Sequence, residues 1–290
     1  MKNILKLLRI KHWVKNLFVF VPLVFARKFT EPHLLFNEII SFFLFCFAAS
    51  IIYIFNDIHD VENDRKHPVK KFRPLASGSL SVRTAIISAF VLFLLGLLIS
   101  LTSNLPDEVF IAIFSYLILN FFYTLKLKRL AIIDILTISA GYVIRVYAGA
   151  FAIDVPVSHW LTVTILFLSL FLAALKRGSE LKRMQGASDT RSVLDDYSEK
   201  LLNNIITVST TGVIMSYLLY SISDKVYSQF HSYNFLFTAI FVIYGIFRVL
   251  FLFYKENKGE DAFELILRDI PSLVNLLLYG ISIFVLIYKF

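Results

Sequence analysis

The chain has 290 residues, of which 58% are hydrophobic, including 30 Phe, and its mean hydropathy is +0.72. A soluble domain cannot hide that much apolar surface, so the composition excludes a soluble globular protein and indicates an integral membrane protein. The formal net charge is +8. The single cysteine, Cys46, lies in an apolar run and excludes an intrachain disulfide.

Apolar windows long enough to cross a bilayer recur along the whole sequence. They predict an all-α membrane protein, a bundle of about nine transmembrane helices that forms a single domain over residues 1–290. The predicted helices are 13–28, 35–56, 80–102, 107–125, 130–152, 158–176, 202–222, 233–254 and 271–289. The N-terminal segment 1–12 is basic and amphipathic, and has no small-residue cleavage site of the kind that ends a signal peptide.

The basic residues are distributed unevenly between the two ends of these helices. If the N-terminus is inside, the inner segments carry most of the Lys and Arg residues. The opposite segments carry only Arg27, Lys28, Lys225 and the C-terminal Lys289. This asymmetry predicts a multi-pass protein of the cell inner (plasma) membrane with a cytoplasmic N-terminus. Loops 57–79 and 177–200 then lie on the cytoplasmic side, where we expect the active site.

The run NDIHDVEND at 56–64 is the strongest chemical signal in the sequence. If it is helical, Asp57, Asp60 and Asp64 stand at i, i+3 and i+7 and share one face. Hard oxygen ligands without a Cys or His cluster favour Mg²⁺, which usually binds through substrate phosphates as well. The run, with Asn56, therefore predicts a site for a magnesium–diphosphate. The alternative is a solvated acidic helix end.

The loop that follows, RKHPVKKFRPLASG, supplies cations next to these carboxylates. Lys70 and Arg73 are close in sequence to the predicted metal, and Lys and Arg beyond a bound cation are what a diphosphate leaving group requires. His67 precedes a proline and is interpreted as a structural residue of the loop. The acidic run and the basic loop therefore predict one site.

A second polar cluster follows the sixth predicted helix and contains Lys176, Arg177 and Glu180. Lys176 and Glu180 are separated by four residues, so an ordinary helix-surface pair is the alternative to a functional role. The polar stretch MQGASDTRSVLDDYSEK comes next, and either covers the site as a lid or is a solvated connection.

Several polar residues fall inside the predicted helices. Arg145 is too deep to be a topology signal, so it requires a partner or a polar cavity. Asp134 precedes it on the same helix. Tyr123 and Lys126 continue a three-residue spacing from Asn120 toward the inner surface. Arg248 is a further intramembrane charge, and the sequence offers no obvious partner for it.

These motifs resemble the UbiA-type intramembrane prenyltransferases, whose first aspartate-rich motif is NDxxDxxxD. The decaprenyl-phosphate phosphoribosyltransferase branch is the most similar. The segments that carry this resemblance are HWVKNLFVFVPLVFA at 12–26, HPVKKFRPLASG at 67–78, the stretch 122–160, KRGSEL at 176–181 and FELILRDIPSLVN at 263–275. The resemblance implies a nine-helix fold, Mg²⁺ as cofactor, and transfer of 5-phosphoribose from phosphoribosyl diphosphate to polyprenyl phosphate in the lipid bilayer.

The resemblance also implies roles for individual residues. Asp57, Asp60 and Asp64 are expected to be catalytic and, with Asn56, to bind the metal. The expected substrate-binding residues are Lys15, Asn56, Lys70, Arg73, Tyr123, Lys126, Arg145, Lys176, Arg177 and Glu180. No nucleic acid is expected as a partner, and the sequence allows a homo-oligomer.

The chain departs from the wider family at one motif. Quinone- and haem-making members carry a second DxxxD motif where this sequence has KRGSE. Fewer acids and two more cations fit substrates with an extra phosphate. The alternative function is prenyl transfer from an allylic diphosphate to an aromatic acceptor. A non-enzymatic alternative is a transporter or binding protein for a phosphorylated lipid.

Overall fold

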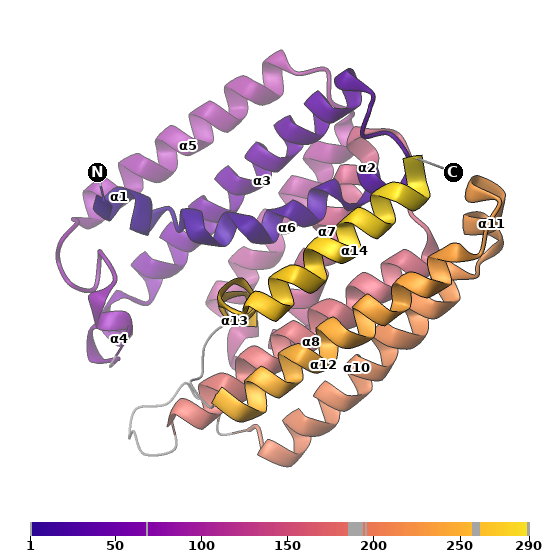
Figure 1. The fold of residues 1–290 in the computed structure, drawn as a ribbon. Coiled ribbons are helices and arrows are strands. Elements are labelled where there is room, and N and C mark those ends of the chain that lie inside the picture. Colours follow the sequence, from indigo (N-terminus) through magenta and orange to yellow (C-terminus); the bar gives the residue numbers. More distant parts are fainter. Residues whose placement is uncertain (1, 68, 185–193, 195, 257–261, 289–290) are drawn as a thin grey trace. The chain divides into compact units, whose positions relative to one another are not determined.

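The computed structural model describes residues 2–67, 69–184, 194, 196–256 and 262–288, and all regular elements in these ranges are helical. Eight helices in the described ranges are long and apolar enough to cross a membrane (Figure 1). They are α3 (Pro32–His59), α5 (Val82–Thr102), α6 (Asp107–Leu125), α7 (Ile133–Ala152), α8 (His159–Met184), α10 (Glu199–Ser221), α12 (Ala239–Glu256) and α14 (Ile270–Tyr288). The prediction of an all-α membrane fold is confirmed, and each of these helices overlaps a predicted one.

The first predicted helix, 13–28, has a different structure. After α1 (Lys2–Leu7), the chain forms the 3₁₀ helix η1 (Ile10–Phe20) and then the short helix α2 (Val21–Phe25). Pro22 lies in the first turn of α2, where its missing amide hydrogen is tolerated, so a new helix starts there. This segment is therefore broken into two short helices and is absent from the eight long ones.

The described residues form two compact units. Unit 1 comprises Met1–Lys128 and Ile144–Pro156, and unit 2 comprises Arg129–Val143 and Val157–Phe290. Helix α7 contributes its first half to unit 2 and its second half to unit 1. Each unit is therefore described separately, with the contacts that position its own charged side chains.

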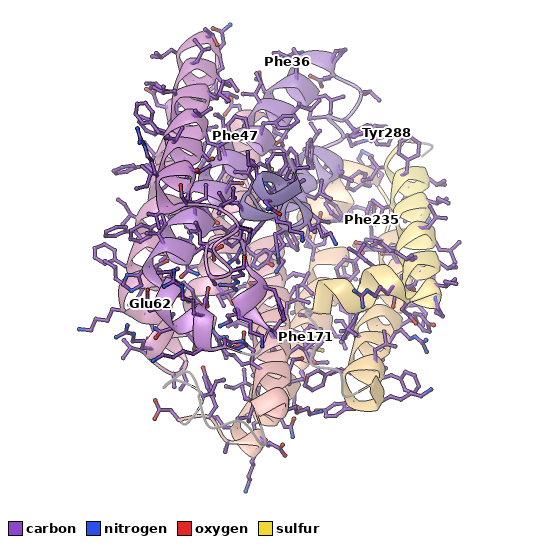
Figure 2. All side chains as sticks on the ribbon, turned by 90° about the vertical axis from the view of Figure 1, so that its left-hand side faces the viewer. Phe36, Phe47, Glu62, Phe171, Phe235 and Tyr288 are labelled. Atoms are coloured by element: carbon purple, nitrogen blue, oxygen red, sulfur yellow. The ribbon has the colours of Figure 1, made fainter. Side chains whose placement is uncertain are left out.

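In unit 1, helix α3 is the central element, and η1, α5 and α6 pack against it. Of the apolar stretch of α3, 56% is buried inside the protein, whereas only 11% of the apolar stretch of α5 is buried. Apolar side chains such as Leu101 on α5 are exposed, as expected for a helix that faces lipid. In Figure 2, Phe36 near the start of α3 and Glu62 just beyond its end lie at opposite ends of this unit. The acidic run thus lies at one end of the unit.

In unit 2, α8 and α10 form the most extensive helix pair, and α12 packs on α10 and on α14 (Figure 1). A core that includes Phe171, Leu202 and Phe253 fills the space between these helices. The shorter elements are α11 (Asp224–Phe230), η4 (Asn234–Thr238) and α13 (Ala262–Arg268). Ser198 caps α10 by accepting a hydrogen bond from the amide of Leu201 at 3.1 Å.

The arginines that the sequence places inside predicted helices, Arg145 and Arg248, have partners within their own unit. In unit 1, Arg145 donates from Nε to Asn16 Oδ1 at 2.7 Å and from Nη2 to Tyr116 Oη at 2.9 Å. Its guanidinium also lies over the Tyr116 ring, 4.5 Å from the centroid. In unit 2, Arg248 donates to both carboxylate oxygens of Asp269, at 3.0 and 2.7 Å. The expectation that a deep arginine needs a partner is met in both units.

Candidate active site

The acidic run crosses the junction between two helices. Helix α3 ends at His59, Asp60 is its C-cap, and α4 (Val61–Lys66) begins immediately afterwards. The amide of Asp60 still donates to the Asn56 carbonyl at 2.9 Å, and that of Asp64 donates to the Asp60 carbonyl at 2.8 Å. Helical spacing is therefore kept across the junction, although the regular helix is interrupted at Asp60.

Arg73 joins two of the three carboxylates. Its Nη1 donates to Asp57 Oδ1 at 3.2 Å and to Asp64 Oδ2 at 2.6 Å. Asp57 also accepts a hydrogen bond from Arg9, whose guanidinium lies 4.6 Å from the centroid of the Tyr53 ring. Arg9 has a left-handed backbone conformation, with φ 51°, between α1 and η1. The chain turn before η1 thus brings a second guanidinium to the end of α3.

Lys128 neutralises the third carboxylate. It lies in η3 (Leu127–Arg129) and its Nζ donates to Asp60 Oδ1 at 2.7 Å, to Asp60 Oδ2 at 2.6 Å and to Asn56 Oδ1 at 3.3 Å. We call these seven residues the unit 1 cluster: Arg9, Asn56, Asp57, Asp60, Asp64, Arg73 and Lys128. Its three carboxylates and three cations cancel in formal charge.

Two of the carboxylates in the unit 1 cluster are suited to binding a hard divalent cation. In the described ranges, His, Cys, Asp and Glu residues form no group of three or more that could hold a metal. Asp57 and Asp64, however, both bind one nitrogen atom of Arg73, so their oxygens face each other across a single cation. Mg²⁺ commonly uses one or two carboxylates and completes its shell with water and substrate phosphates. These two carboxylates fit that pattern better than a three-carboxylate cage.

The cations of the unit 1 cluster crowd one another. Burial and the neighbouring Arg9 lower the pKa of Arg73 from its ordinary value, against the opposing effect of Asp57 and Asp64. Arg9 and Arg73 have side chains that are 17% and 25% exposed, so water and small anions can reach both. Two partly exposed guanidiniums that repel each other are suited to binding an oxyanion with several charged oxygens.

The other residues predicted for this site in unit 1 have varied surroundings. Lys15, Lys70 and Tyr123 are half-buried, whereas Lys126 is exposed. His67 Nδ1 accepts the amide hydrogens of Val69 and Lys70, at 3.1 and 3.2 Å, which agrees with its predicted structural role in the loop. Arg145 binds Asn16 and Tyr116, as described above. Substrate binding by Lys15, Lys70, Tyr123, Lys126 and Arg145 stays a prediction.

Unit 2 contains a second charged cluster. Arg177 on α8 donates from Nε to Asp134 Oδ2 and from Nη1 to Glu180 Oε2. Tyr197, just before α10, donates from Oη to Asp134 Oδ1 at 2.7 Å. We call these four residues, Asp134, Arg177, Glu180 and Tyr197, the unit 2 cluster. The side chains of Asp134 and Arg177 are 0% exposed.

The face of α8 that carries Lys176 and Glu180 is more exposed to solvent than the buried face that carries Arg177. Lys176 and Glu180 are four residues apart, share one face of the helix and are partly exposed. Arg177 lies on the buried side of the same turn. In the predicted loop 177–200, residues 185–193 and 195 lie outside the described residues, so the alternatives of a lid and a solvated connection both stand as predictions.

Sequence reasoning did not assign Arg9, Lys128, Asp134 or Tyr197 to a site. Their partners are distant in the chain: Arg9 is 48 residues from Asp57, Lys128 is 68 from Asp60, and Tyr197 is 63 from Asp134. No local spacing can reveal such pairs. Only Asp134 could have been found from the sequence, because it lies inside the predicted helix 130–152, where a carboxylate requires a partner.

Comparisons with known proteins show the family to which the chain belongs. Residues 17–268 match the UbiA prenyltransferase family. The chain is 36% identical over 228 residues to the decaprenyl-phosphate phosphoribosyltransferase of Mycolicibacterium smegmatis, which covers 76% of this chain and 70% of that protein. It is 34% identical over 234 residues to the enzyme of the same name from Mycobacterium tuberculosis, covering 78% of this chain and 76% of the relative.

Solved structures share the fold. A UbiA homologue from Archaeoglobus fulgidus, bound to DMAPP and Mg²⁺, superposes with a TM-score of 0.72 at 18% identity and covers 99% of both chains. The apo structure of a UbiA homologue from Aeropyrum pernix superposes with a TM-score of 0.71 at 15% identity, over 95% of this chain and 98% of that one. At these identities the likeness concerns the fold alone.

Proposed function

Because the chain belongs to the UbiA prenyltransferase family, we propose that it transfers 5-phosphoribose from phosphoribosyl diphosphate to polyprenyl phosphate. The relatives named decaprenyl-phosphate phosphoribosyltransferase support this choice of substrates. The observation that carries the proposal is the unit 1 cluster, which gathers carboxylates and partly exposed guanidiniums at one end of an apolar helix. Such a site is suited to a metal-bound diphosphate.

In this proposal the unit 1 cluster binds the diphosphate of the donor. Asp57 and Asp64, with Asp60 and Asn56 as neighbours, would hold Mg²⁺, which neutralises charge on the diphosphate when it is bound. Arg73 and Arg9 would then exchange part of their carboxylate contacts for phosphate oxygens, which accept bidentate hydrogen bonds from guanidinium. Lys128, already within 3.3 Å of both Asn56 and Asp60, adds a point charge on the same side.

The proposed reaction is a substitution at the anomeric carbon of the ribose. The bond from this carbon to the diphosphate oxygen breaks, and the electron pair leaves with inorganic diphosphate. A bond forms between the same carbon and an oxygen of the acceptor phosphate. This phosphate is already anionic at neutral pH, so no general base has to take a proton from it. Catalysis would therefore rest on positioning and on stabilisation of the leaving group's charge.

Residues beyond the unit 1 cluster are assigned to the remaining phosphates. Lys15, Lys70, Tyr123 and Lys126, with Arg145 deeper in unit 1, are proposed to contribute to substrate binding. In unit 2, Lys176 is proposed to bind a phosphate of the donor. We place the reaction at the cytoplasmic face of the inner membrane, because the basic segments collect on that side in the predicted topology.

The decisive experiment offers both donor classes to membranes that contain the protein. Labelled phosphoribosyl diphosphate with polyprenyl phosphate is compared with a labelled allylic diphosphate and an aromatic acid. We expect label to enter lipid from the phosphoribosyl donor, with release of one diphosphate per transfer, and we expect EDTA to stop the reaction until Mg²⁺ is restored. Label that enters product only from the allylic donor would instead establish prenyl transfer.

A transporter or binding protein gives a third pattern in the same assay. It would bind phosphoribosyl diphosphate or polyprenyl phosphate, but neither labelled lipid nor inorganic diphosphate would form. Full activity in EDTA would refute the assignment of the carboxylates to a metal.

A further inference from the structure

The unit 2 cluster connects three parts of the chain. Asp134 lies in the first turn of α7, Arg177 lies in α8, and Tyr197 lies two residues before α10. Asp134 and Arg177 are fully buried and Tyr197 is 4% exposed. Because water does not reach these groups, the orientation of the Arg177 guanidinium depends on its protein partners.

The hydroxyl group of Tyr197 has two hydrogen bonds. It donates to Asp134 Oδ1 at 2.7 Å and accepts the amide hydrogen of Ile132 at 2.6 Å. Burial raises the pKa of Tyr197, and the bond to Asp134 acts in the same direction, so the hydroxyl keeps the proton that it donates. Tyr197 therefore fixes both the carboxylate at the start of α7 and the backbone that leads into it.

That backbone is strained. Ile132 has φ 70°, in the left-handed region, which is a genuine outlier for a β-branched side chain. Such a conformation persists only where its surroundings determine it, and the Tyr197 hydroxyl is the group that binds its amide. The start of α7 is thus held in a conformation that the sequence alone disfavours.

The chain of contacts continues to the surface of α8. Asp134 Oδ2 accepts from Arg177 Nε, and Arg177 Nη1 donates to Glu180. The side chain of Glu180 is 24% exposed, and Lys176 is also partly exposed one turn away. The buried members of the cluster thus fix a carboxylate that water and ligands can reach, next to a lysine.

We propose that Tyr197 is a positioning residue, which acts through Asp134 and Arg177 to orient Glu180, beside Lys176, for binding the phosphoribosyl donor. The inference rests on the proposed function. A carboxylate accepts hydrogen bonds from hydroxyl groups, and a lysine binds phosphate as a point charge. The donor carries both ring hydroxyls and phosphates, whereas the tail of polyprenyl phosphate is a hydrocarbon. Arg177 then acts from inside the protein and does not touch the substrate.

The test is the Tyr197→Phe variant, which keeps the ring in the unit 2 core and removes only the hydroxyl. We expect KM for phosphoribosyl diphosphate to rise about tenfold, because a hydrogen bond to a charged group is lost, while KM for polyprenyl phosphate is unchanged. The matched control is Tyr217→Phe. That hydroxyl is also buried in unit 2, bonded to Thr238 at 2.6 Å and to Tyr279 at 3.2 Å, and its loss should change neither KM.

A second variant tests whether Tyr197 acts through Asp134. Asp134→Asn should raise KM for the donor, and the double variant with Tyr197→Phe should be no worse than the more impaired single one. Additive effects would overturn the proposed sequence of contacts. Equal changes in both KM values, or a lowered unfolding temperature with normal kinetics, would show a structural role only.

These outcomes separate the inference from the function on which it rests. If the unmodified protein transfers phosphoribose and Tyr197→Phe has the same KM for the donor, only the positioning role is refuted. If the unmodified protein neither binds nor uses phosphoribosyl diphosphate, the proposed function fails and the inference fails with it.

Discussion

The two charged clusters use the same ion-pair chemistry but differ in their access to water. In the unit 1 cluster, the Arg9 and Arg73 side chains are 17% and 25% exposed, while in the unit 2 cluster Arg177 is 0% exposed. A partly solvated cation can exchange a carboxylate for a ligand at small cost, whereas a buried one cannot leave its partner without stranding a charge. We infer that the unit 1 cluster binds ligand directly, whereas the buried members of the unit 2 cluster, Asp134, Arg177 and Tyr197, fix the position of Glu180.

The largest effect on turnover is expected for the carboxylates of the unit 1 cluster, which are proposed to hold Mg²⁺. Asp64→Asn keeps the size of the side chain but removes a charge from the proposed Mg²⁺ site, and Asp60→Asn does the same beside Lys128. Turnover should fall by about a thousandfold, because the departing diphosphate loses its charge stabilisation. The measurement is diphosphate release by purified protein in detergent. Both variants should remain folded, as judged by gel filtration and thermal unfolding.

Near-normal turnover in either carboxylate variant would mean that other residues bind the metal. Loss of the folded protein would instead assign these side chains a structural role, like that of the buried Asp134 and Arg177. Either result would break the distinction between the two clusters.

The next largest effect concerns stability. Arg177→Met leaves the buried Asp134 carboxylate without its cation and should destabilise the protein by about 3–5 kcal/mol. Arg9→Met should cost less, about 1 kcal/mol, because the carboxylate of its partner Asp57 keeps a contact to Arg73. Denaturant unfolding in detergent measures both changes.

Removal of both charges from the buried pair is the control for that prediction. Asp134→Asn combined with Arg177→Met should recover most of the lost stability, since no buried charge is then unpaired. A double variant as unstable as Arg177→Met alone would show that packing, rather than charge, accounts for the loss.

A smaller effect, on donor binding, is expected at Lys128, which belongs to the unit 1 cluster. Lys128→Met should raise KM for the diphosphate donor about tenfold, because one charge-assisted hydrogen bond is lost. The neighbouring Arg129→Met serves as control, since Arg129 is exposed and its loss should leave KM unchanged. Equal effects of the two variants would reduce Lys128 to a general contribution to the positive surface.

Sequence reasoning succeeded where the signal is local and failed where it is long-range. The apolar windows predicted the eight long helices, and the spacing of Asp57 and Asp64 predicted that they act together, as their shared contact with Arg73 supports. The segment 13–28 was predicted as a helix from its apolar character although Lys15 and Pro22 interrupt it, and in the structure Pro22 lies in the first turn of a new short helix. The sequence predicted that Arg177 binds substrate, and it did not reveal that Arg177 is buried against Asp134, 43 residues away. Burial of a charge is decided by tertiary packing.

The Arg248–Asp269 pair provides an intermediate case between the two clusters, with side chains 25% and 12% exposed. Asp269 precedes α14 and accepts hydrogen bonds from the amide and hydroxyl of Ser272 at 2.9 and 2.7 Å, so it caps that helix as well. Asp269→Asn should therefore destabilise the protein by about 1–2 kcal/mol. The control is Asp224→Asn on α11, where the side chain is exposed and the loss should be a few tenths of a kcal/mol.

The stability difference between the unmodified protein and Asp269→Asn should depend on pH, and the pKa of Asp269 determines the direction of that dependence. Hydrogen bonds from Arg248 hold the pKa of Asp269 well below its ordinary value. A group with a lowered pKa in the folded state contributes stability that is complete above its unfolded pKa and is lost as the pH falls through the folded pKa. The stability difference between the unmodified protein and Asp269→Asn should thus be constant from pH 7 to about pH 5 and shrink only below about pH 4. A difference that stays constant below about pH 4 would mean that the pKa of Asp269 is the same in the folded and unfolded states, so that Arg248 does not lower it.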